Sequence, residues 1–524
     1  MSSLVFILLF FAQTARGDEW RTLSTQATDA YNRGAYAESE KLNRSALALA
    51  EDTGDRDDRL AATLSNLGSS CQAQGRYAEA EKFYRRALEL RESIFGADHS
   101  QTAAVINNLA ALYQATGRYS DAEPLFRRAL RIWEQPGSDS TSHVATALNN
   151  LAGIYRAQGR YAEAEPAYLR ALQIHESMLG SDSAGVARVL DNLGVLYQDQ
   201  GRYQEAQRVE TRALGIQERV LGPEHPEIAG TLTNLADVSR MQWRFAEAQA
   251  FYERAIAIRE KQLGPNHPQL AETLNGLAVL YRAEERFADA EQLYQRALEI
   301  ARASLGSEHP RVATSLNNLG QLAAAQGRYP EAKRLYERAL AIWEKALGPD
   351  HPALAPGLTN LAAVYYSRHK YDEAGALYRR AMKIDETHLG SAHMTLAGDL
   401  NNVGTVCYAR HQYADAEDYY RRSVAMYERT AGPESPRLVD PLLNLAVLYT
   451  AEHRFADTAP IYRRALALRE QALGANHPKL AETLEQYAAV MRKLEDYAEA
   501  EKAEVRALGI RVRLALREDS GAGQ

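Results

Sequence analysis

One pattern of residues recurs along this 524-residue chain every 42 positions. Stepping by 42 from Asn66 reaches further asparagines at Asn108, Asn150, Asn192, Asn234, Asn318, Asn360, Asn402 and Asn444, and misses only at Gly276 and Gln486. Stepping from Tyr77 reaches an aromatic residue every time as far as Tyr497. This regular period predicts one elongated array of repeated units instead of several globular domains.

Each repeat contains two segments with apolar residues at three- and four-residue spacing, for example residues 105–114 and 119–133, which predicts two helices. Glycines suited to a left-handed helix C-terminus follow the first segment at Gly75, Gly117, Gly159, Gly201 and Gly327. The loop at residues 347–352 ends on a proline suited to the first helical position. We also expect a delayed or kinked start of the second helix where it carries Pro124, Pro166 or Pro460.

Two columns of small residues alternate with columns of large ones, as closely packed helices require. The first small column is alanine from Ala80 to Ala500 except at Thr458, and the second is alanine from Ala87 to Ala507 except at Ser423. The large columns include Leu64, Leu148, Leu190, Leu232, Leu274, Leu316 and Leu400 on the first helix, and Tyr84, Phe126, Tyr168, Tyr252, Tyr294, Tyr336, Tyr378, Tyr420 and Tyr462 on the second. These columns predict one core repeated along an axis.

Leu, Ala or Gly, and Tyr on the first helix, with Ala, Tyr or Phe, and Ala on the second, resemble the tetratricopeptide repeat. The 42-residue stride and the Leu-Gly-x-x-His-Pro loop are similar to its kinesin light chain subtype. The resemblance covers residues 60 to 515 or so and implies an all-α, right-handed α-solenoid superhelix of about twelve units, with first helices inside and second helices outside. The heptad segment by which kinesin light chains bind their motor is not found, which favours a bacterial protein built from the same repeat over a motor adaptor.

The repeat register divides the chain into four parts. We expect a signal peptide at residues 1–17, a degenerate first unit at 18–59, eleven regular units at 60–517 and a disordered tail at 518–524. The signal rests on the apolar run at residues 4–12 and on the small residues Ala15 and Gly17, although no Lys or Arg precedes the run. The alternative is a hydrophobic cap on the first helix, or a wrongly chosen start.

Export would place the mature protein in a periplasm or outside the cell, and we expect no membrane span in it. The alternative location is the cytoplasm.

The net charge of -7 gives no reason to expect nucleic acid as a partner. Cys71 and Cys407 share one column, eight repeats apart, too far for a disulfide. No phosphate loop, zinc-protease helix, nucleophile elbow or dinucleotide fingerprint is present, so we expect neither an enzyme nor a cofactor.

The recurring asparagine has two interpretations. It could hydrogen-bond neighbouring helices and fix their stacking, or it could line a groove and bind the backbone of an extended peptide. Neighbouring helices pack about 8 to 10 Å apart and an extended chain advances about 3.3 Å per residue, so each asparagine could meet every third residue of a ligand. The candidates are Asn108, Asn150, Asn192, Asn234, Asn318, Asn360, Asn402 and Asn444.

Selectivity would come from groove positions that vary. Such positions hold Arg156, Arg188, Arg240 and Arg282 in the middle repeats, and Tyr366 and Tyr408 in later ones. Guanidinium groups match carboxylates, and tyrosine supplies amphipathic contact area. We therefore expect a protein or peptide partner with acidic and apolar side chains. Three nearby aspartates weaken the expectation of an acidic partner: Asp191, Asp199 and Asp237. The alternative is that these positions form an ordinary solvated face.

Three further columns are too regular to select a ligand. An acidic column runs from Glu79 to Glu499 and an arginine column from Arg86 to Arg506, and we expect them to form ion pairs between units. One loop column holds His99, His225, His267, His309, His351, His393 and His477. Single histidines spaced a repeat apart do not converge on a metal, so we expect them to cap loops.

Together these patterns predict a non-enzymatic protein-interaction scaffold, monomeric or weakly oligomeric, that binds an extended segment in its concave groove. The competing hypothesis is a cell-envelope protein whose convex face binds glycan or another copy of itself.

Overall fold

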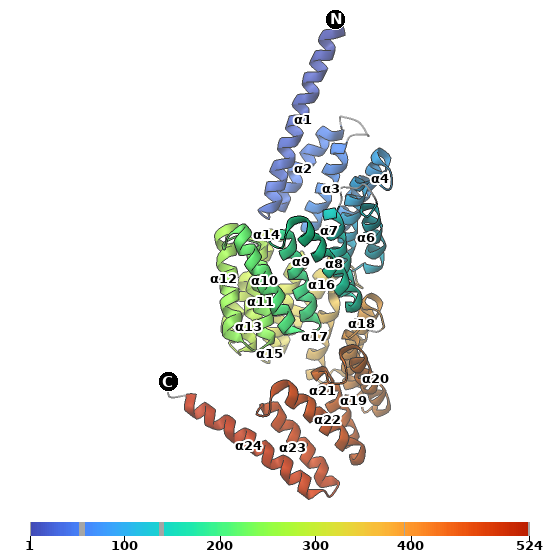
Figure 1. Ribbon diagram of the computed structural model, residues 1–524. Coiled ribbons are helices and arrows are strands. Elements are labelled where there is room, and N and C mark those ends of the chain that lie inside the picture. The colour runs from blue at the N-terminus through green and yellow to red at the C-terminus, as the bar shows by residue number, and fades with distance from the viewer. Residues whose placement is uncertain (1, 52–57, 136–140, 392, 522–524) are drawn as a thin grey trace. The chain divides into compact units, whose positions relative to one another are not determined.

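The computed structural model describes residues 2–51, 58–135, 141–391 and 393–521 (Figure 1). Within these ranges the chain forms 24 α-helices and one short 3-10 helix, and it has no β-strand. The chain divides into two compact units, unit 1 at Met1–Gly357 and unit 2 at Leu358–Gln524.

Unit 1 contains sixteen complete helices. They are α1 (Ser2–Asn32), α2 (Tyr36–Glu51), α3 (Asp58–Ala73), α4 (Tyr77–Phe95), α5 (Ser100–Ala115), α6 (Tyr119–Trp133), α7 (Thr141–Ala157), α8 (Tyr161–Leu179), α9 (Ala184–Asp199), α10 (Tyr203–Leu221), α11 (Ile228–Met241), α12 (Phe245–Leu263), α13 (Pro268–Ala283), α14 (Phe287–Leu305), α15 (Pro310–Ala325) and α16 (Tyr329–Leu347). The border between the units falls inside α17 (Leu354–Ser367).

Unit 2 continues the same alternation of helices. It contains α18 (Tyr371–Leu389), α19 (Thr395–Ala409), α20 (Tyr413–Ala431), the 3-10 helix η1 (Pro436–Leu438), α21 (Val439–Ala451), α22 (Phe455–Leu473), α23 (Pro478–Lys493) and α24 (Tyr497–Gly521). The helix α24 runs past Arg517, where the sequence suggested an end, and residues 522–524 lie outside the described part of the chain.

Helices pack in consecutive pairs, from α1 with α2 to α15 with α16 in unit 1, and from α19 with α20 to α23 with α24 in unit 2. First helices of neighbouring pairs also approach each other, as α5 does with α7 and α19 does with α21. Elements on the inner side of a curved stack lie closest together, so the first helices line the inner face of each unit. The prediction of an α-solenoid of tandem helix pairs is confirmed.

The core follows the predicted columns. Every alanine of the first small column is fully buried, for example Ala80 and Ala290. Thr458, the exception in this column, and Ser423, the exception in the second small column, are fully buried as well. The aromatic column of the second helices fills the space between them, for example with Tyr252 and Tyr294. The two cysteines are free and buried.

The helix ends also follow the sequence. The predicted turn glycines adopt left-handed geometry, with φ of +74° at Gly75 and +66° at Gly117. The second helices with an internal proline begin in the same column as the others, at Tyr119, Tyr161 and Phe455, so the predicted delay is wrong. Each proline lies in the second turn, where it removes only one i→i−4 hydrogen bond.

Unit 1 also contains contacts between turns more than 230 residues apart. A Cβ at Gly34 would lie 2.9 Å from His267 Nε2, and a Cβ at Gly117 would lie 2.5 Å from Pro352 Cδ. Gly75 occupies the same position against His309. These turn-to-loop contacts, at Gly34, Gly75 and Gly117, join helix pairs that are far apart in sequence.

The helix α1 begins at Ser2, so it includes the residues of the expected signal peptide from Ser2 onward. In the part of the chain that the structure describes, no helix is long and apolar enough to cross a membrane.

Candidate functional site on the inner face of the first helices

The asparagine column forms a ladder between neighbouring first helices. The Nδ2 of Asn150 donates to Asn107 Oδ1 (3.0 Å), and that of Asn192 donates to Asn149 Oδ1 (2.8 Å). Asn444 in unit 2 repeats the contact. These three asparagines link their helices to the first helix of the preceding repeat, whereas the Nδ2 of Asn234 donates to Glu210 Oε2 on α10 (3.5 Å). All eight candidates are half-buried on the inner face: Asn108, Asn150, Asn192, Asn234, Asn318, Asn360, Asn402 and Asn444.

Two of the predicted groove arginines already have acidic partners. Arg156 Nη1 lies 2.8 Å from Asp199 Oδ2 on the next first helix. Arg240 Nη2 lies 3.1 Å from Asp237 Oδ1, one turn earlier on α11. The aspartates that the sequence showed near these arginines therefore neutralise them, and neither guanidinium group is fully available to a ligand.

Arg282 differs from these two. It is half-buried on α13, and among the described residues no carboxylate lies within ion-pair distance of it. Its charge acts on the phenols of Tyr294 and Tyr336. Burial raises the pKa of Tyr294 to about 12, so this phenol remains a hydrogen-bond donor at neutral pH, and its oxygen has no partner in the described part of the chain.

Arg188 lies on α9 and is exposed. It is close enough to the buried His175 to lower the pKa of that imidazole, an effect that adds to the larger effect of burial. The structure therefore places Arg188 beside α8, near its C-terminal end, and no contact within the described part of the chain joins it to Arg156, Arg240 or Arg282.

Unit 2 presents aromatic groups where unit 1 presents arginines. Tyr366 packs against Tyr371 with ring centroids 5.4 Å apart, and Tyr408 packs against Tyr413 at 5.7 Å. Burial raises the pKa of Tyr366, and the neighbouring Tyr371 and Tyr408 add to this effect. The two predicted tyrosines therefore belong to one continuous aromatic surface.

Two pockets lie on these inner faces. In unit 1 a polar pocket of about 200 Å³ opens between α1, α2 and α3, and its lining includes Ser39, Asn43 and Asn66. In unit 2 a more apolar pocket of about 430 Å³ is lined by Thr450, His453, Phe455, Tyr462, Gln486, Ala489, Val490 and Lys493. The two units thus offer chemically different hollows.

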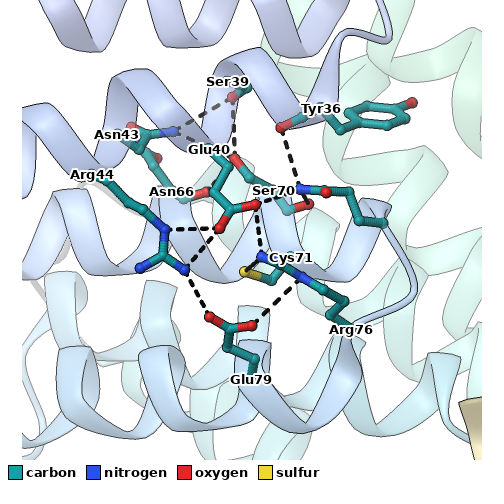
Figure 2. A network of polar contacts seen from close by, with 11 residues as sticks. Tyr36, Ser39, Glu40, Asn43, Arg44, Asn66, Ser70, Cys71, Arg76 and Glu79 are labelled. Carbon is teal, nitrogen blue, oxygen red and sulfur yellow. Dashed lines mark hydrogen bonds and ion pairs between the residues drawn. The ribbon is translucent and has the colours of Figure 1, made fainter. Parts of the chain in front are cut away.

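A network of charged groups lies beside the polar pocket (Figure 2). Glu40 binds Arg76 (2.7 Å) and Arg44 (2.8 Å), and Arg44 also binds Glu79 (2.8 Å). Burial alone would raise the pKa of Glu40, but hydrogen bonds from Arg76, Gln74 and Arg44 outweigh it and hold the pKa below the ordinary range.

Glu40, Cys71 and Glu79 are close enough together to suggest a metal site, since their ligand atoms lie within 4.8 Å of one another. The guanidinium groups of Arg44 and Arg76 already supply the positive charge between the carboxylates (Figure 2). Burial also raises the pKa of the Cys71 thiol, which disfavours the thiolate that a metal requires. The arrangement therefore joins the first helix pairs through ion pairs.

Of the two regular charged columns, the arginine column pairs between repeats as expected, and the acidic column does not. Arg128 Nη2 contacts Glu92 Oε1 (2.8 Å) of the preceding repeat, as predicted for the arginine column. The acidic column pairs mainly inside its own repeat, as Asp121 does with Arg118 (2.7 Å). The histidine column caps loops as predicted. His309 Nδ1, for example, accepts from the backbone N–H of Arg311 (3.1 Å).

Two buried carboxyl pairs were not predicted from the sequence. In unit 1, burial and the neighbouring Asp191 raise the pKa of Glu210 well above its usual range. In unit 2, burial raises the pKa of Asp385 to about 6, and burial together with Asp385 raises that of Asp399 to about 8. Glu210 replaces the aromatic residue of its column, which was the one signal available in the sequence.

Comparisons with known proteins agree with the repeat architecture. Sequence models of the tetratricopeptide repeat match residues 21–93, 59–135, 143–219, 211–261, 227–303, 269–342, 311–387, 395–457 and 440–511, and a second model of this repeat matches residues 107–178. A search of curated proteins gave no match.

Solved structures with similar folds have low superposition scores. BtubC (BKLC) from P. vanneervenii is 29% identical, with a TM-score of 0.35, over 46% of this chain and 92% of that one. A putative kinesin light chain with nearly identical TPR-like repeats from Podosopora anserina is 28% identical, with a TM-score of 0.33, over 39% and 98%. Yeast Tom70 is 13% identical, with a TM-score of 0.41, over 95% and 97%. The assignment to a family therefore rests on the sequence models.

Proposed function

The chain belongs to the tetratricopeptide repeat family, and from this we propose that it is a non-enzymatic protein-interaction scaffold whose unit 1 binds an extended, acidic peptide segment along its first helices.

The observation that supports this proposal is the state of Arg282. A half-buried guanidinium group without a carboxylate partner is costly, because the charge has lost part of its hydration without compensation. Its neighbours Arg156 and Arg240 have aspartate partners, so the sequence supplies a counter-ion at those two positions and leaves the third without one. A carboxylate from a ligand would complete the third pair, and the Tyr294 hydroxyl could donate to it after a small movement of the side chain.

The asparagine ladder has a positioning role in this proposal. Because Asn150 and Asn192 bind the preceding first helix, they hold neighbouring helices in register. Neighbouring helices lie about 8 to 10 Å apart, so a peptide in extended conformation would meet a new helix at about every third residue. We therefore assign selectivity to the arginine and tyrosine columns, with Tyr366 and Tyr408 offering a separate aromatic surface in unit 2.

A peptide with period-three acidic residues tests the proposal. The probe is a labelled (Glu-Val-Ser)4 peptide, and its control is (Gln-Val-Ser)4. We expect the full chain to prefer the acidic peptide, and Arg282→Gln to weaken that binding about tenfold in fluorescence polarisation, because a charge-assisted hydrogen bond is lost.

Arg302→Gln is the matched control, since it removes the same charge from an exposed position on α14. Equal losses in both variants would show that only net charge matters, and would contradict the proposal. A fall in melting temperature with Arg282→Gln would show that this residue has a structural role instead.

We also propose that the chain is exported, on the basis of the apolar run at residues 4–12 and the small residues Ala15 and Gly17. Intact-mass measurement of the protein from its native cell should show the loss of about 17 residues, as expected for a cleaved signal. A full-length mass would contradict export through a cleaved signal.

A further inference from the structure

The last helix, α24, has an apolar face that no other helix in the described part of the chain covers. Tyr497, Val505 and Leu508 on this face are 63%, 63% and 62% exposed, and Val512 is 48% exposed. Their spacing puts them on one side of the helix. In the preceding repeat, Leu466 corresponds to Leu508 and is buried, and Phe455 corresponds to Tyr497 and is half-buried.

The sequence makes this face more apolar than its counterparts. The column of Val505 holds a charged or polar residue in nearly every other repeat, including Arg421 and Arg463. The column of Val512 holds glutamate in nearly every other repeat, including Glu428 and Glu470. A surface that needed only water contact would have no reason for valine at both positions.

One acidic residue, Glu501, lies within this apolar face, and its column has a defined role elsewhere. Glu81 accepts a hydrogen bond from the Tyr113 hydroxyl (2.8 Å) and another from Arg118 (2.9 Å), both on the next repeat. Glu165 binds Tyr197 and Arg202 in the same way, and Glu417 binds Tyr449 and Arg454. In each case the arginine follows the tyrosine by five residues.

Glu501 has the same position on its helix but lacks both donors. It is exposed, and among the described residues it has no ion pair. The face of α24 is therefore equivalent to an inter-repeat surface whose acceptor is present and whose tyrosine and arginine no described residue supplies.

We propose that the face of α24 formed by Tyr497, Glu501, Val505, Leu508 and Val512 is a docking surface for an amphipathic helix of another protein. That helix presents a tyrosine and, five residues later, an arginine to Glu501, and it covers the two valines and Leu508 with apolar side chains. This inference does not depend on the groove, and its failure would leave the proposed peptide binding untouched.

A helix taken from this chain provides the probe. A labelled peptide with the sequence of residues 101–120 contains Tyr113 and Arg118 and fits the equivalent face of α4 through Glu81. We expect it to bind the full chain, Glu501→Gln to weaken binding about tenfold, and Leu508→Asp to abolish it, because a carboxylate would replace an apolar contact. Leu508 is 62% exposed, so circular dichroism should show unchanged folding.

A double-mutant cycle identifies the contact. The peptide variant R118A should bind the unmodified chain about tenfold more weakly, but should bind the Glu501→Gln chain no more weakly than the unmodified peptide does. Additive losses, or binding that survives Leu508→Asp, would overturn the proposal. Self-association that Leu508→Asp disperses in light scattering would also overturn it, because a second copy would then occupy the face.

Discussion

Units 1 and 2 reach the same backbone geometry at the turn inside each repeat with different residues. In unit 1 the turns at Gly34, Gly75 and Gly117 are glycine with positive φ, whereas Trp243 and Glu285 occupy this position in two later repeats, with φ of +61° and +60°. In unit 2 the four corresponding residues are His369, His411, His453 and Glu495, with φ between +58° and +62°. Because other residues tolerate the turn, the left-handed backbone alone does not require glycine.

The difference shows what the first three glycines contribute. Gly34, Gly75 and Gly117 lie against the His-Pro loops of distant repeats, and a Cβ would come within 3.1 Å of the loop at each. Gly201 has the same φ as Gly75 but open space around its Cβ position. A close approach therefore requires glycine at Gly34, Gly75 and Gly117, whereas the four turns of unit 2 adopt the left-handed backbone without glycine, at a modest conformational cost.

The tryptophans allow the two units to be followed separately. The chain has four of them, Trp20, Trp133, Trp243 and Trp343, and all lie in unit 1. Tryptophan fluorescence therefore reports on unit 1, and circular dichroism reports on both units.

The largest expected effect is that of Gly117→Ala. The new Cβ would overlap Pro352, so we expect the unfolding free energy of unit 1 to fall by about 2 to 4 kcal/mol, through overpacking and a left-handed alanine. Gly201→Ala is the control and should cost about 1 kcal/mol, because only the backbone term remains. Urea unfolding followed by tryptophan fluorescence measures both. Equal losses would show that the turn-to-loop contact contributes no stability.

The next effect concerns pH and the carboxyl pair of Asp385 and Asp399 in unit 2. The folded-state pKa values of Asp385 and Asp399 lie above those of the unfolded chain, at about 6 and about 8. The folded unit therefore binds more protons, and its stability is present at low pH and lost as the pH rises through this window.

Asp399→Asn should remove this loss and stabilise unit 2 by about 2 kcal/mol at pH 8, with little effect at pH 5. Circular dichroism melts at the two pH values measure this gain in stability. At each pH the fluorescence transition of unit 1 should be the same in the variant and in the unmodified chain. An equal gain at both pH values would mean that the carboxyl group does not titrate in this range.

The smallest effect is that of His411→Gly. Glycine adopts φ near +60° more readily than histidine, so we expect unit 2 to gain about 0.5 to 1 kcal/mol. The gain is reduced by loss of the contact between His411 Nδ1 and the Tyr413 hydroxyl, 3.0 Å apart. A lower melting temperature by circular dichroism would show that this contact outweighs the strain of the turn.

Features that repeat were predictable from the sequence, and features that occur once were not. The period fixed the helix pairs, the buried Ala290 column and the loop-capping histidines, because each such residue meets the same neighbours in every repeat. The contacts of Gly34 with His267 depend instead on small rotations summed over several repeats, which no single repeat encodes.

The candidate site shows the same limit. Spacing placed Arg156, Arg240 and Arg282 in one column but could not tell which of them meets an aspartate, since that depends on rotamers across neighbouring helices. The columns also hid the role of the asparagines, because a residue on the inner face can bind a neighbour or a ligand. Where a column changes residue type, as at Glu210 and Val505, the sequence does carry a usable signal.

The turn-to-loop contacts of Gly34, Gly75 and Gly117 bear on how unit 1 responds to a pulling force. Stretching a stack of helix pairs normally spreads a small rotation over every interface, which gives a soft, spring-like elasticity. Contacts that connect distant repeats must rupture before unit 1 can lengthen, so it should resist small extensions and then yield abruptly. If unit 1 binds an extended peptide as proposed, the peptide would therefore enter along the first helices lengthwise, because the helix pairs do not separate easily.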